Sequence, residues 1–197
     1  MSKNSKEEDF IEIKAILVGS SGVGKTNLIN VTVGQGFNES SKPTNCCNLL
    51  QKNLEINNIK YVINLWDTIG QEAYKGISKL FFREAQIVIF VYDITSKDSF
   101  LNLEEWIQMA NDIIDGEYIS GIVGNKNDLY LHSQVSEAEA REYAINKNMK
   151  FRLVSAKEDP KSFEEFLIEL VKEFKIPEQQ MKMILNNNPM PKTNKCC

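Results

Sequence analysis

The chain has 197 residues, which suits one domain with a full hydrophobic core. Its net charge of -4 argues against nucleic acid as a main partner, and no apolar run approaches the roughly 20 residues that a transmembrane helix needs. The apolar run from Ile87 to Tyr92 is only six residues long. The polar segment 1–9 does not resemble a signal peptide, and Ser2 stands where N-myristoylation needs glycine. These features predict a location on the cytosolic side.

The four cysteines agree with that expectation. They form two adjacent pairs, Cys46-Cys47 and Cys196-Cys197. This spacing is neither the framework of a disulfide-rich secreted protein nor the C-x-x-C pattern of a zinc site.

Strand-like and helix-like segments alternate along the chain. Strands are predicted at 10–18, 49–56, 59–66, 86–92, 118–123 and 151–154, and helices at 25–33, 99–114, 136–147 and 162–174. Asn57 and Asn58 form a predicted two-residue hairpin turn. The alternation predicts an α/β fold, with a six-stranded, mostly parallel sheet, helices on both faces and one antiparallel hairpin strand.

Two capping boxes mark predicted helix starts. The first begins at Ser136 and the second at Ser162, each followed three residues later by a glutamate. Beyond Pro177 the sequence turns polar and loses its periodicity, so residues 177–197 are predicted to form a flexible tail. The predicted organisation is therefore a polar N-terminal extension (1–9), one domain (10–176) and this tail.

A phosphate-binding motif lies between the first predicted strand and the first predicted helix. Residues 19–26, Gly-Ser-Ser-Gly-Val-Gly-Lys-Thr, fit the pattern G-x-x-x-x-G-K-[ST]. Small residues let backbone N–H groups surround phosphate oxygens, and the helix N-terminus adds the positive end of its dipole. Lys25 would supply charge to the β- and γ-phosphates as a candidate catalytic residue, and the Thr26 hydroxyl would bind Mg²⁺. The candidate nucleotide-binding residues here are Ser21, Gly22, Val23, Gly24, Lys25, Thr26 and Asn27.

The segment after the third predicted strand can serve the γ-phosphate. Asp67 at the strand end can reach Mg²⁺ through water. Gly70 can offer its N–H to the γ-phosphate, and Gln71 can orient a water for in-line attack, which makes it the second candidate catalytic residue. Taken alone, Asp67 could instead cap a helix and Gln71 could simply face solvent.

A candidate guanine site follows the strand that ends at Val123. Residues 124–129 read Gly-Asn-Lys-Asn-Asp-Leu, and the Asp128 carboxylate can accept hydrogen bonds from the N1–H and 2-amino groups of guanine. Adenine offers neither group at those positions, so such a site discriminates strongly. The chain contains 20 asparagines, so the evidence is the position of the motif after a strand, 100 residues beyond Lys25. The candidate residues are Asn125, Lys126, Asp128 and Leu129.

Ser155-Ala156-Lys157, after the last predicted strand, completes the set. Its backbone can meet the guanine O6, and Lys157 can stack on the base. The tripeptide carries no meaning without the other motifs.

With four motifs in this order, residues 10–175 resemble the small GTPases of the Ras superfamily, and Rab proteins most closely. The Rab-like signatures are residues 66–72, 81–85 and 90–95. The resemblance implies a P-loop NTPase small G domain that binds GTP and GDP with Mg²⁺ and hydrolyses GTP to GDP and phosphate, as a molecular switch in vesicle trafficking. It also implies that Thr44 is a Mg²⁺ ligand and that Phe37 lies against the guanine.

The resemblance further implies membrane and protein partners. Cys196-Cys197 matches the double cysteine to which Rab proteins attach two geranylgeranyl chains, which implies anchoring to the cytoplasmic face of an intracellular or vesicle membrane, with a cytosolic pool. The implied protein partners are an exchange factor, a GTPase-activating protein, a GDP dissociation inhibitor and effectors. The effector-facing trio of Rab proteins corresponds to Leu49, Trp66 and Phe81.

The switch regions depart from the Rab pattern. Asn45 and Cys46 replace Ile-Gly, Ile69 replaces the alanine of Asp-Thr-Ala-Gly-Gln, and Leu49 replaces an aromatic residue of the trio. Two alternatives to a hydrolytic switch stand beside it. One is a nucleotide-holding scaffold with impaired hydrolysis, and the other is an ATP-using P-loop enzyme, against which the guanine site argues.

Overall fold

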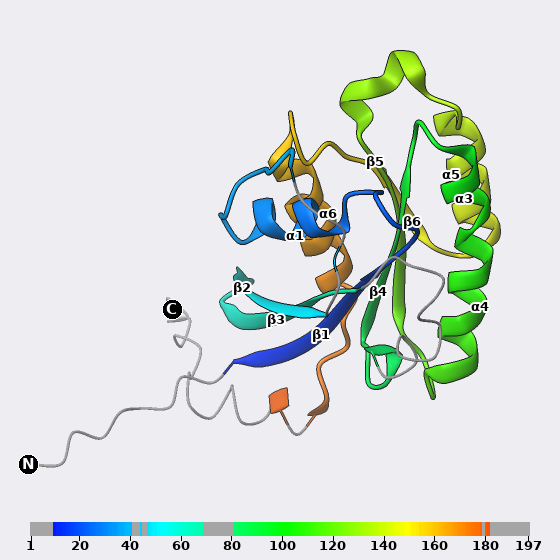
Figure 1. Ribbon diagram of the computed structural model, residues 1–197. Coiled ribbons are helices and arrows are strands. Elements are labelled where there is room, and N and C mark those ends of the chain that lie inside the picture. Colours follow the sequence, from blue (N-terminus) through cyan, green and yellow to red (C-terminus); the bar gives the residue numbers. More distant parts are fainter. Residues whose placement is uncertain (1–9, 41–43, 45–46, 69–80, 179, 182–197) are drawn as a thin grey trace, which may run out of the picture.

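A six-stranded sheet lies at the centre of the computed structural model, which describes residues 10–40, 44, 47–68, 81–178 and 180–181 (Figure 1). The strands are β1 (Ile11–Val18), β2 (Asn48–Ile56), β3 (Ile59–Asp67), β4 (Ile87–Asp93), β5 (Ile119–Asn125) and β6 (Lys150–Leu153), in the spatial order β2-β3-β1-β4-β5-β6. All neighbours pair in parallel except β2, which pairs antiparallel with β3. The predicted α/β architecture is confirmed.

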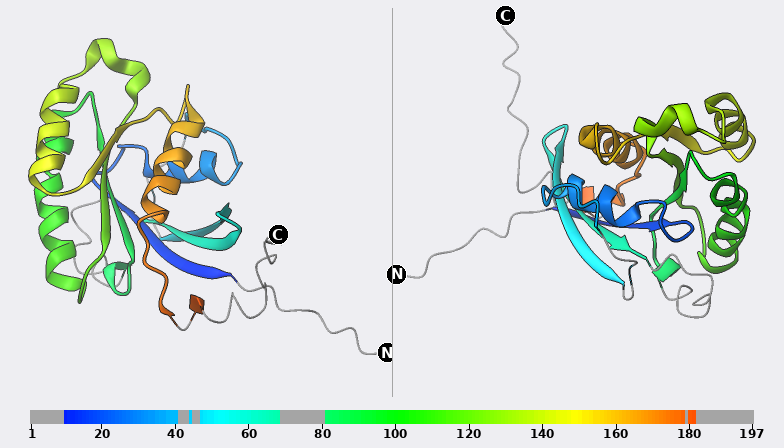
Figure 2. Two further views of the ribbon diagram at one scale, coloured as in Figure 1. Left: turned by 180° about the vertical axis from the view of Figure 1, so that it is seen from behind. Right: turned by 45° about the horizontal axis from the view of Figure 1, so that its top comes forward.

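Helices cover both faces of this sheet (Figures 1 and 2). One face carries α1 (Lys25–Thr32) and α6 (Pro160–Val171), and the other carries α3 (Lys97–Leu101), α4 (Leu103–Ile113) and α5 (Glu137–Asn146). Among the described residues, no helix is both long and apolar enough to cross a bilayer.

The sheet separates two hydrophobic cores because successive side chains of a strand point to opposite faces. Ile13 of β1 packs in the core with α1 and α6, whereas Ile16 packs in the core with α3, α4 and α5. All seven residues of β4 are buried, since both faces of this strand are covered. Trp106 of α4, only 6% exposed, belongs to the second core. By holding the strands in place, the two cores position the strand ends that carry the predicted site residues.

Two local predictions are confirmed in detail. Asn57 and Asn58 have φ angles of 53° and 62°, as a two-residue type I′ turn between β2 and β3 requires. Ser136 caps α5, because its hydroxyl accepts a hydrogen bond from the Glu139 N–H at 3.2 Å.

The predicted capping box at Ser162 is wrong. Helix α6 begins two residues earlier, at Pro160, with Asp159 as its N-cap. The proline ring sets φ for a first helical residue and needs no N–H there, so the helix starts at that point. Ser162 lies inside the helix, where its hydroxyl donates to the Asp159 carbonyl at 2.6 Å.

The single helix predicted at 99–114 is two helices, α3 and α4. The first begins earlier than predicted, at Lys97, with the Ser96 hydroxyl accepting a hydrogen bond from the Ser99 N–H. The second begins at Leu103, and the two meet at Asn102. Asn102 retains helical angles, with φ -68° and ψ -11°, so one apolar stripe runs through both helices.

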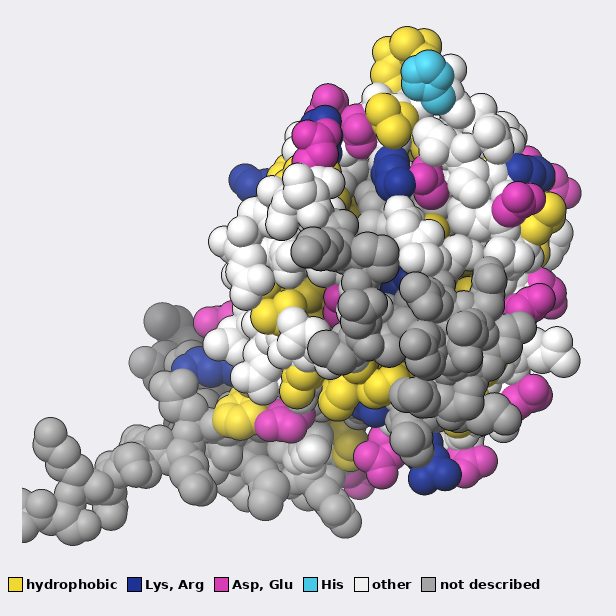
Figure 3. Space-filling model, viewed as in Figure 1, with side chains coloured by type: hydrophobic (Ala, Val, Ile, Leu, Met, Phe, Trp, Pro, Cys, Tyr) yellow, Lys and Arg dark blue, Asp and Glu magenta, His cyan; other side chains and the backbone are white. Residues whose placement is uncertain are grey.

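A 3₁₀ helix, η2 (Asn127–His132), projects beyond the sheet next to the β5 end. Tyr130 and Leu131 are 65% and 81% exposed. Figure 3 shows the single histidine of the chain, His132, at the top of the molecule beside hydrophobic side chains. His132 is exposed to solvent.

Candidate functional site

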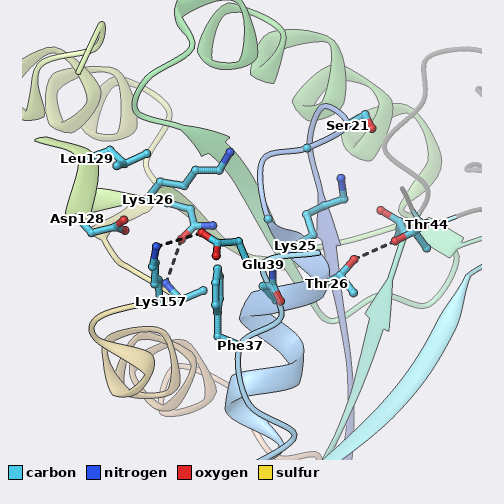
Figure 4. Close-up of a pocket in the computed structure, with 16 residues that line it drawn as sticks. Ser21, Lys25, Thr26, Phe37, Glu39, Thr44, Lys126, Asp128, Leu129 and Lys157 are labelled. Atoms are coloured by element: carbon cyan, nitrogen blue, oxygen red, sulfur yellow. Dashed lines mark hydrogen bonds and ion pairs between the residues drawn. The ribbon is translucent and has the colours of Figure 1, made fainter. Parts of the chain in front are cut away.

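A pocket of about 420 Å³ opens where parallel strands end, at the carboxyl edge of the sheet (Figure 4). It is lined by Ser21, Gly22, Gly24, Lys25, Thr26, Asn27, Phe37, Glu39, Thr44, Thr68, Asn125, Lys126, Asp128, Leu129, Ala156 and Lys157. The structure thus brings together most of the predicted nucleotide-binding residues. Val23 and Ser155 support the lining from behind it.

The turn from β1 into α1 needs glycine at two points. A Cβ atom on Gly19 would lie 2.0 Å from the Val91 carbonyl oxygen. A Cβ atom on Gly24, where φ is +98°, would lie 2.3 Å from the amide nitrogen of Asn125. These close approaches let the loop curl tightly around the space that the helix N-terminus faces.

Lys25 lies inside this loop. Its ammonium group donates to the carbonyl oxygens of Gly19, at 2.8 Å, and Ser20, at 3.0 Å, and the residue is only 5% exposed. Burial lowers the pKa of Lys25 to about 8, and the charge of Asp67 opposes that shift. A buried cation held by carbonyl oxygens is suited to receive phosphate oxygens as stronger partners.

Two threonine hydroxyls meet the carboxylate of Asp67. Thr26 Oγ1 donates to Asp67 Oδ2 at 2.8 Å, and Thr44 Oγ1 lies 3.3 Å from the same oxygen and 2.9 Å from Thr26 Oγ1. Burial raises the pKa of Asp67, against the lowering effects of the Thr26 hydrogen bond, the Lys25 charge and the Thr44 hydrogen bond. Asp67 is 2% exposed, and its Oδ1 has no hydrogen-bond partner among the described residues. Clustered hard oxygen donors and an unpartnered buried carboxylate oxygen fit Mg²⁺.

Asn125 connects the phosphate loop to the predicted guanine loops. Its amide nitrogen donates to the Val23 carbonyl at 2.8 Å, and its amide oxygen accepts from the Ala156 N–H at 3.3 Å. Val23 therefore contributes its backbone, while its side chain is 1% exposed and lies in the core. One side chain fixes three segments relative to one another.

Asp128 is oriented by Ser155. The Ser155 hydroxyl donates to Asp128 Oδ1 at 2.6 Å and accepts from the Glu158 N–H at 3.0 Å. Because Ser155 is itself only 5% exposed, its hydroxyl is held in place, and the contact fixes the carboxylate at the pocket wall. A carboxylate so placed can accept two hydrogen bonds from one edge of a base.

The opposite wall is formed by Phe37 and its neighbours. Asn27 makes two hydrogen bonds of 3.0 Å to the backbone of Asn38, which hold the adjacent Phe37 ring at the pocket. Lys157 Nζ lies 3.2 Å from Glu39 Oε1, across the mouth of the pocket (Figure 4). A planar base could therefore lie between the Phe37 ring and the aliphatic part of the Lys157 side chain.

Three residues near the pocket were not predicted from the sequence. Glu39 and Thr68 line it, and Thr68 Oγ1 donates to the Leu17 carbonyl at 2.5 Å. Asp93, at the end of β4, pairs with Lys126 at 2.6 Å. Thr68 directly follows Asp67 in its motif, which is a usable signal. Glu39 and Asp93 belong to no motif that was assigned to the pocket.

The predicted effector-facing trio also comes together. Leu49 of β2 is paired with Trp66 of β3, and the rings of Trp66 and Phe81 lie 5.9 Å apart. Lys14 Nζ lies 5.0 Å from the Trp66 ring centroid and donates to the Arg83 carbonyl at 2.7 Å. Burial lowers the pKa of Lys14, although the charges of Glu84 and Cys47 oppose this. The trio therefore forms one surface, with Leu49 44% exposed.

Other predicted residues lie outside the described part of the chain. They are Asn45, Cys46, Ile69, Gly70, Gln71, Cys196 and Cys197.

The comparisons with known proteins agree with this geometry. Residues 14–176 match the Ras family. The GTP-binding protein ypt3 of Schizosaccharomyces pombe is 35% identical over 170 residues, which cover 86% of this chain and 79% of ypt3. The Ras-related protein Rab-30 of Homo sapiens is 32% identical over 200 residues, covering 98% and 97% of the two chains. Rab-17 of Mus musculus is 38% identical over 145 residues, covering 73% and 67%. The chain therefore belongs to the Ras family, in its Rab group, and is a small GTPase of vesicle trafficking that hydrolyses GTP to GDP and phosphate.

Proposed function

We propose that the pocket described above is where this GTPase binds GTP and GDP, and that the residues predicted from the motifs have the roles assigned to them. The observation that carries the proposal is the Asp67 carboxylate, which receives hydrogen bonds from Thr26 of the phosphate loop and Thr44 of the first switch region. These oxygens lie beside the Lys25 ammonium group, so positive charge and metal-binding oxygens share one end of the pocket.

At the phosphate end, Lys25 would bind the β- and γ-phosphate oxygens. Thr26 and Thr44 would supply hydroxyl ligands to Mg²⁺, and Asp67 would reach the ion through water. When bound, Mg²⁺ neutralises charge that develops on the phosphate oxygens. Because Thr44 lies in a switch loop, its contact with the metal site would order that loop in the GTP state and release it after hydrolysis.

At the base end, Asp128 would accept hydrogen bonds from the N1–H and 2-amino groups of guanine. Ser155 already fixes one carboxylate oxygen, which prevents the side chain from turning to suit adenine. Phe37 and Lys157 would lie against the two faces of the base. Bound ATP would cover the carboxylate without supplying these donors, so the site would reject it strongly.

Hydrolysis would use Gln71 to orient the attacking water and the Gly70 N–H to contact the γ-phosphate. Both assignments come from the Rab resemblance, and both residues lie outside the described ones. No observation favours the alternative of a nucleotide-holding scaffold with impaired hydrolysis.

The membrane and protein partners are also proposed from the resemblance. Prenyl groups on Cys196 and Cys197 would anchor the chain to the cytoplasmic face of an intracellular or vesicle membrane, since two lipid signals give stable anchoring where one does not. Residues 177–197 would form the connecting tail, 10–176 the G domain and 1–9 a polar extension. An exchange factor, a GTPase-activating protein, a GDP dissociation inhibitor and effectors would act on the switch regions, the effectors through Leu49, Trp66 and Phe81.

Nucleotide affinity tests the assignment directly. Fluorescent GDP, GTP and ATP would be titrated into the protein with Mg²⁺ and with EDTA. We expect GDP and GTP to bind and ATP to bind at least about a thousandfold more weakly. Asp67→Asn should lose most of the difference between Mg²⁺ and EDTA, whereas Asp112→Asn, an exposed position on α4, should keep it. Comparable affinities for ATP and GTP would refute the base-site assignment.

A further inference from the structure

The Lys126 side chain is held by an ion pair on the far side of the pocket wall. Lys126 Nζ lies 2.6 Å from Asp93 Oδ2, and the side chains are 34% and 11% exposed. Asp93 does not line the pocket, whereas Lys126 does. A carboxylate this well buried is stable only when its oxygens have partners, so the contacts of Asp93 define what it does.

Asp93 has partners on both oxygens. While Oδ2 faces Lys126, Oδ1 accepts hydrogen bonds from the Thr95 N–H at 2.8 Å and the Thr95 hydroxyl at 2.7 Å. The Asp93 N–H donates to the Ser99 hydroxyl at 3.0 Å. The carboxylate is therefore an anion fixed to the end of β4 and to the turn that leads into α3.

The register of the sheet places this anion beside the guanine loop. Asp93 is the last residue of β4 and is paired with Asn125, the last residue of β5. The Ile94 N–H donates to the Asn125 carbonyl at 3.1 Å, so the two strand ends stay joined immediately before Lys126. The side-chain pair then connects β4 to the next residue of the loop.

Lys126 has an unusual backbone conformation at this point. Its φ of 66° and ψ of 35° lie in the left-handed region, which disfavours residues with a Cβ atom. The turn at Lys126 lies between Asn125, which holds the phosphate loop, and Asp128, which faces the pocket (Figure 4). A change of conformation at Lys126 would redirect Asp128.

We infer that Asp93 is a positioning residue for nucleotide retention: its carboxylate holds Lys126 in the left-handed turn that aims Asp128 into the pocket, and so slows nucleotide release. The inference deepens the proposed function and rests on it. If the unmodified protein binds guanine nucleotide, the proposed function holds, and the variants below decide only the role of Asp93.

The test is the dissociation rate of a fluorescent GDP. Asp93→Asn keeps the side-chain shape and an acceptor for Thr95, and it removes the charge that faces Lys126. Asp93 does not line the pocket, so its change should act on dissociation more than on association, and we expect a rate increase on the order of tenfold. The same factor should appear for fluorescent GTP, and in both Mg²⁺ and EDTA, because the phosphate end is unchanged. The rate of single-turnover hydrolysis of bound GTP should stay within about twofold of that of the unmodified protein. A general loosening of the fold would instead misplace the catalytic groups and lower this rate.

Three further variants separate this role from a structural one. Thr95→Val removes one hydrogen bond to Asp93 but keeps the ion pair, so its dissociation rate should stay within about twofold. Lys126→Met breaks the pair from the other side and remains informative if Asp93→Asn does not fold. Because Lys126 also lines the pocket, Lys126→Met should be the faster single variant, and adding Asp93→Asn to it should not speed GDP release further, since the interaction that Asp93→Asn removes is already absent. An unchanged rate in Asp93→Asn, an equal acceleration in Thr95→Val, or additive effects in the double variant would each overturn the inference.

Discussion

The phosphate end and the base end of the pocket are built in different ways. The phosphate end is built on one continuous segment, 19–26, which leaves β1, enters α1 and carries a buried cation, with Thr44 and Asp67 added from elsewhere. The base end is assembled from Phe37, residues 125–129 and residues 155–157, which meet only because β5 and β6 are neighbours and α1 lies beside α6. Its polar groups are fixed by hydrogen bonds such as that between Ser155 and Asp128.

This difference separates affinity from selectivity. A cation in a backbone loop attracts any polyphosphate, whatever base is attached to it. An oriented carboxylate distinguishes bases, because a wrong base leaves it buried and unpaired. Changes at the base end should therefore alter which nucleotide binds, and changes at the phosphate end should alter how tightly all nucleotides bind.

The largest expected effect is on base selectivity. Asp128→Asn should change the ratio of GTP to xanthosine triphosphate affinity by on the order of a thousandfold or more in favour of xanthine, because the amide can donate where the carboxylate could only accept. Competition titrations with both nucleotides would measure the ratio. Asp115→Asn, an exposed change far from the base, serves as the control. If Asp128→Asn weakened both nucleotides equally, the base end would not be the selective end.

The next effect concerns affinity without selectivity. Lys25→Met should weaken GDP and GTP binding by about 3 kcal/mol, on the order of a hundredfold, because charge-assisted hydrogen bonds to phosphate are lost. The GTP-to-xanthosine triphosphate ratio should stay constant. Isothermal titration would report both values, with Lys161→Met, an exposed lysine on α6, as the matched control. A changed ratio would contradict the separation between the two ends.

The Asn125 side chain connects the phosphate loop to the base end of the pocket, and a pair of glycine variants tests this contact. Gly22→Ala places a Cβ where nothing lies within 4 Å, at a φ of +79°, and should cost about 1–2 kcal/mol from backbone conformation alone. Gly24→Ala has the same backbone penalty at +98° and also drives a Cβ to within 2.3 Å of the Asn125 amide. We expect a further loss of about 1–3 kcal/mol, and calorimetry on the nucleotide-free proteins should show a Tm several degrees lower for Gly24→Ala than for Gly22→Ala. Equal Tm values for the two variants would show that the Asn125 side chain moves aside at no cost in stability.

The smallest effect is a pH dependence. Burial lowers the pKa of Lys25 to about 8, and neighbouring phosphate oxygens raise the pKa of the ammonium group in the complex. Its contribution to binding is therefore fully present below pH 8 and is lost as the pH rises above that value. The association constant for GDP should fall by up to about tenfold per pH unit there. Titrations from pH 7 to 9.5 would measure the slope, which Lys25→Met should lack. A flat profile for the unmodified protein would contradict the assignment.

The sheet could be predicted from the sequence because its strands are short apolar or alternating segments next to polar turns. The errors occur where two local signals compete. At the start of α6, the capping pattern of Ser162 lost to Pro160, which fixes the first helical φ. At Asn102, an unbroken apolar stripe concealed a boundary between two helices, because the backbone there stays close to helical angles.

The residues of the pocket could likewise be predicted only in part. The motifs identified the residues that would contact a nucleotide, because each motif is only a few residues long and directly follows a strand. The supporting contacts were not predictable, since Glu39 and Lys157 are 118 residues apart and meet only in the folded chain. The pairing of Asp93 with Lys126 likewise depends on the register of β4 against β5.

The positions of the two tryptophans have a spectroscopic consequence. Trp66 lies on the proposed effector surface with the Lys14 ammonium group over its ring, whereas Trp106 is enclosed in the core beneath α4. An effector that covers Trp66 would remove water from one indole and leave the other unchanged. The emission spectrum of the unlabelled protein, and its quenching by acrylamide, would then report effector docking against an internal reference in the same chain.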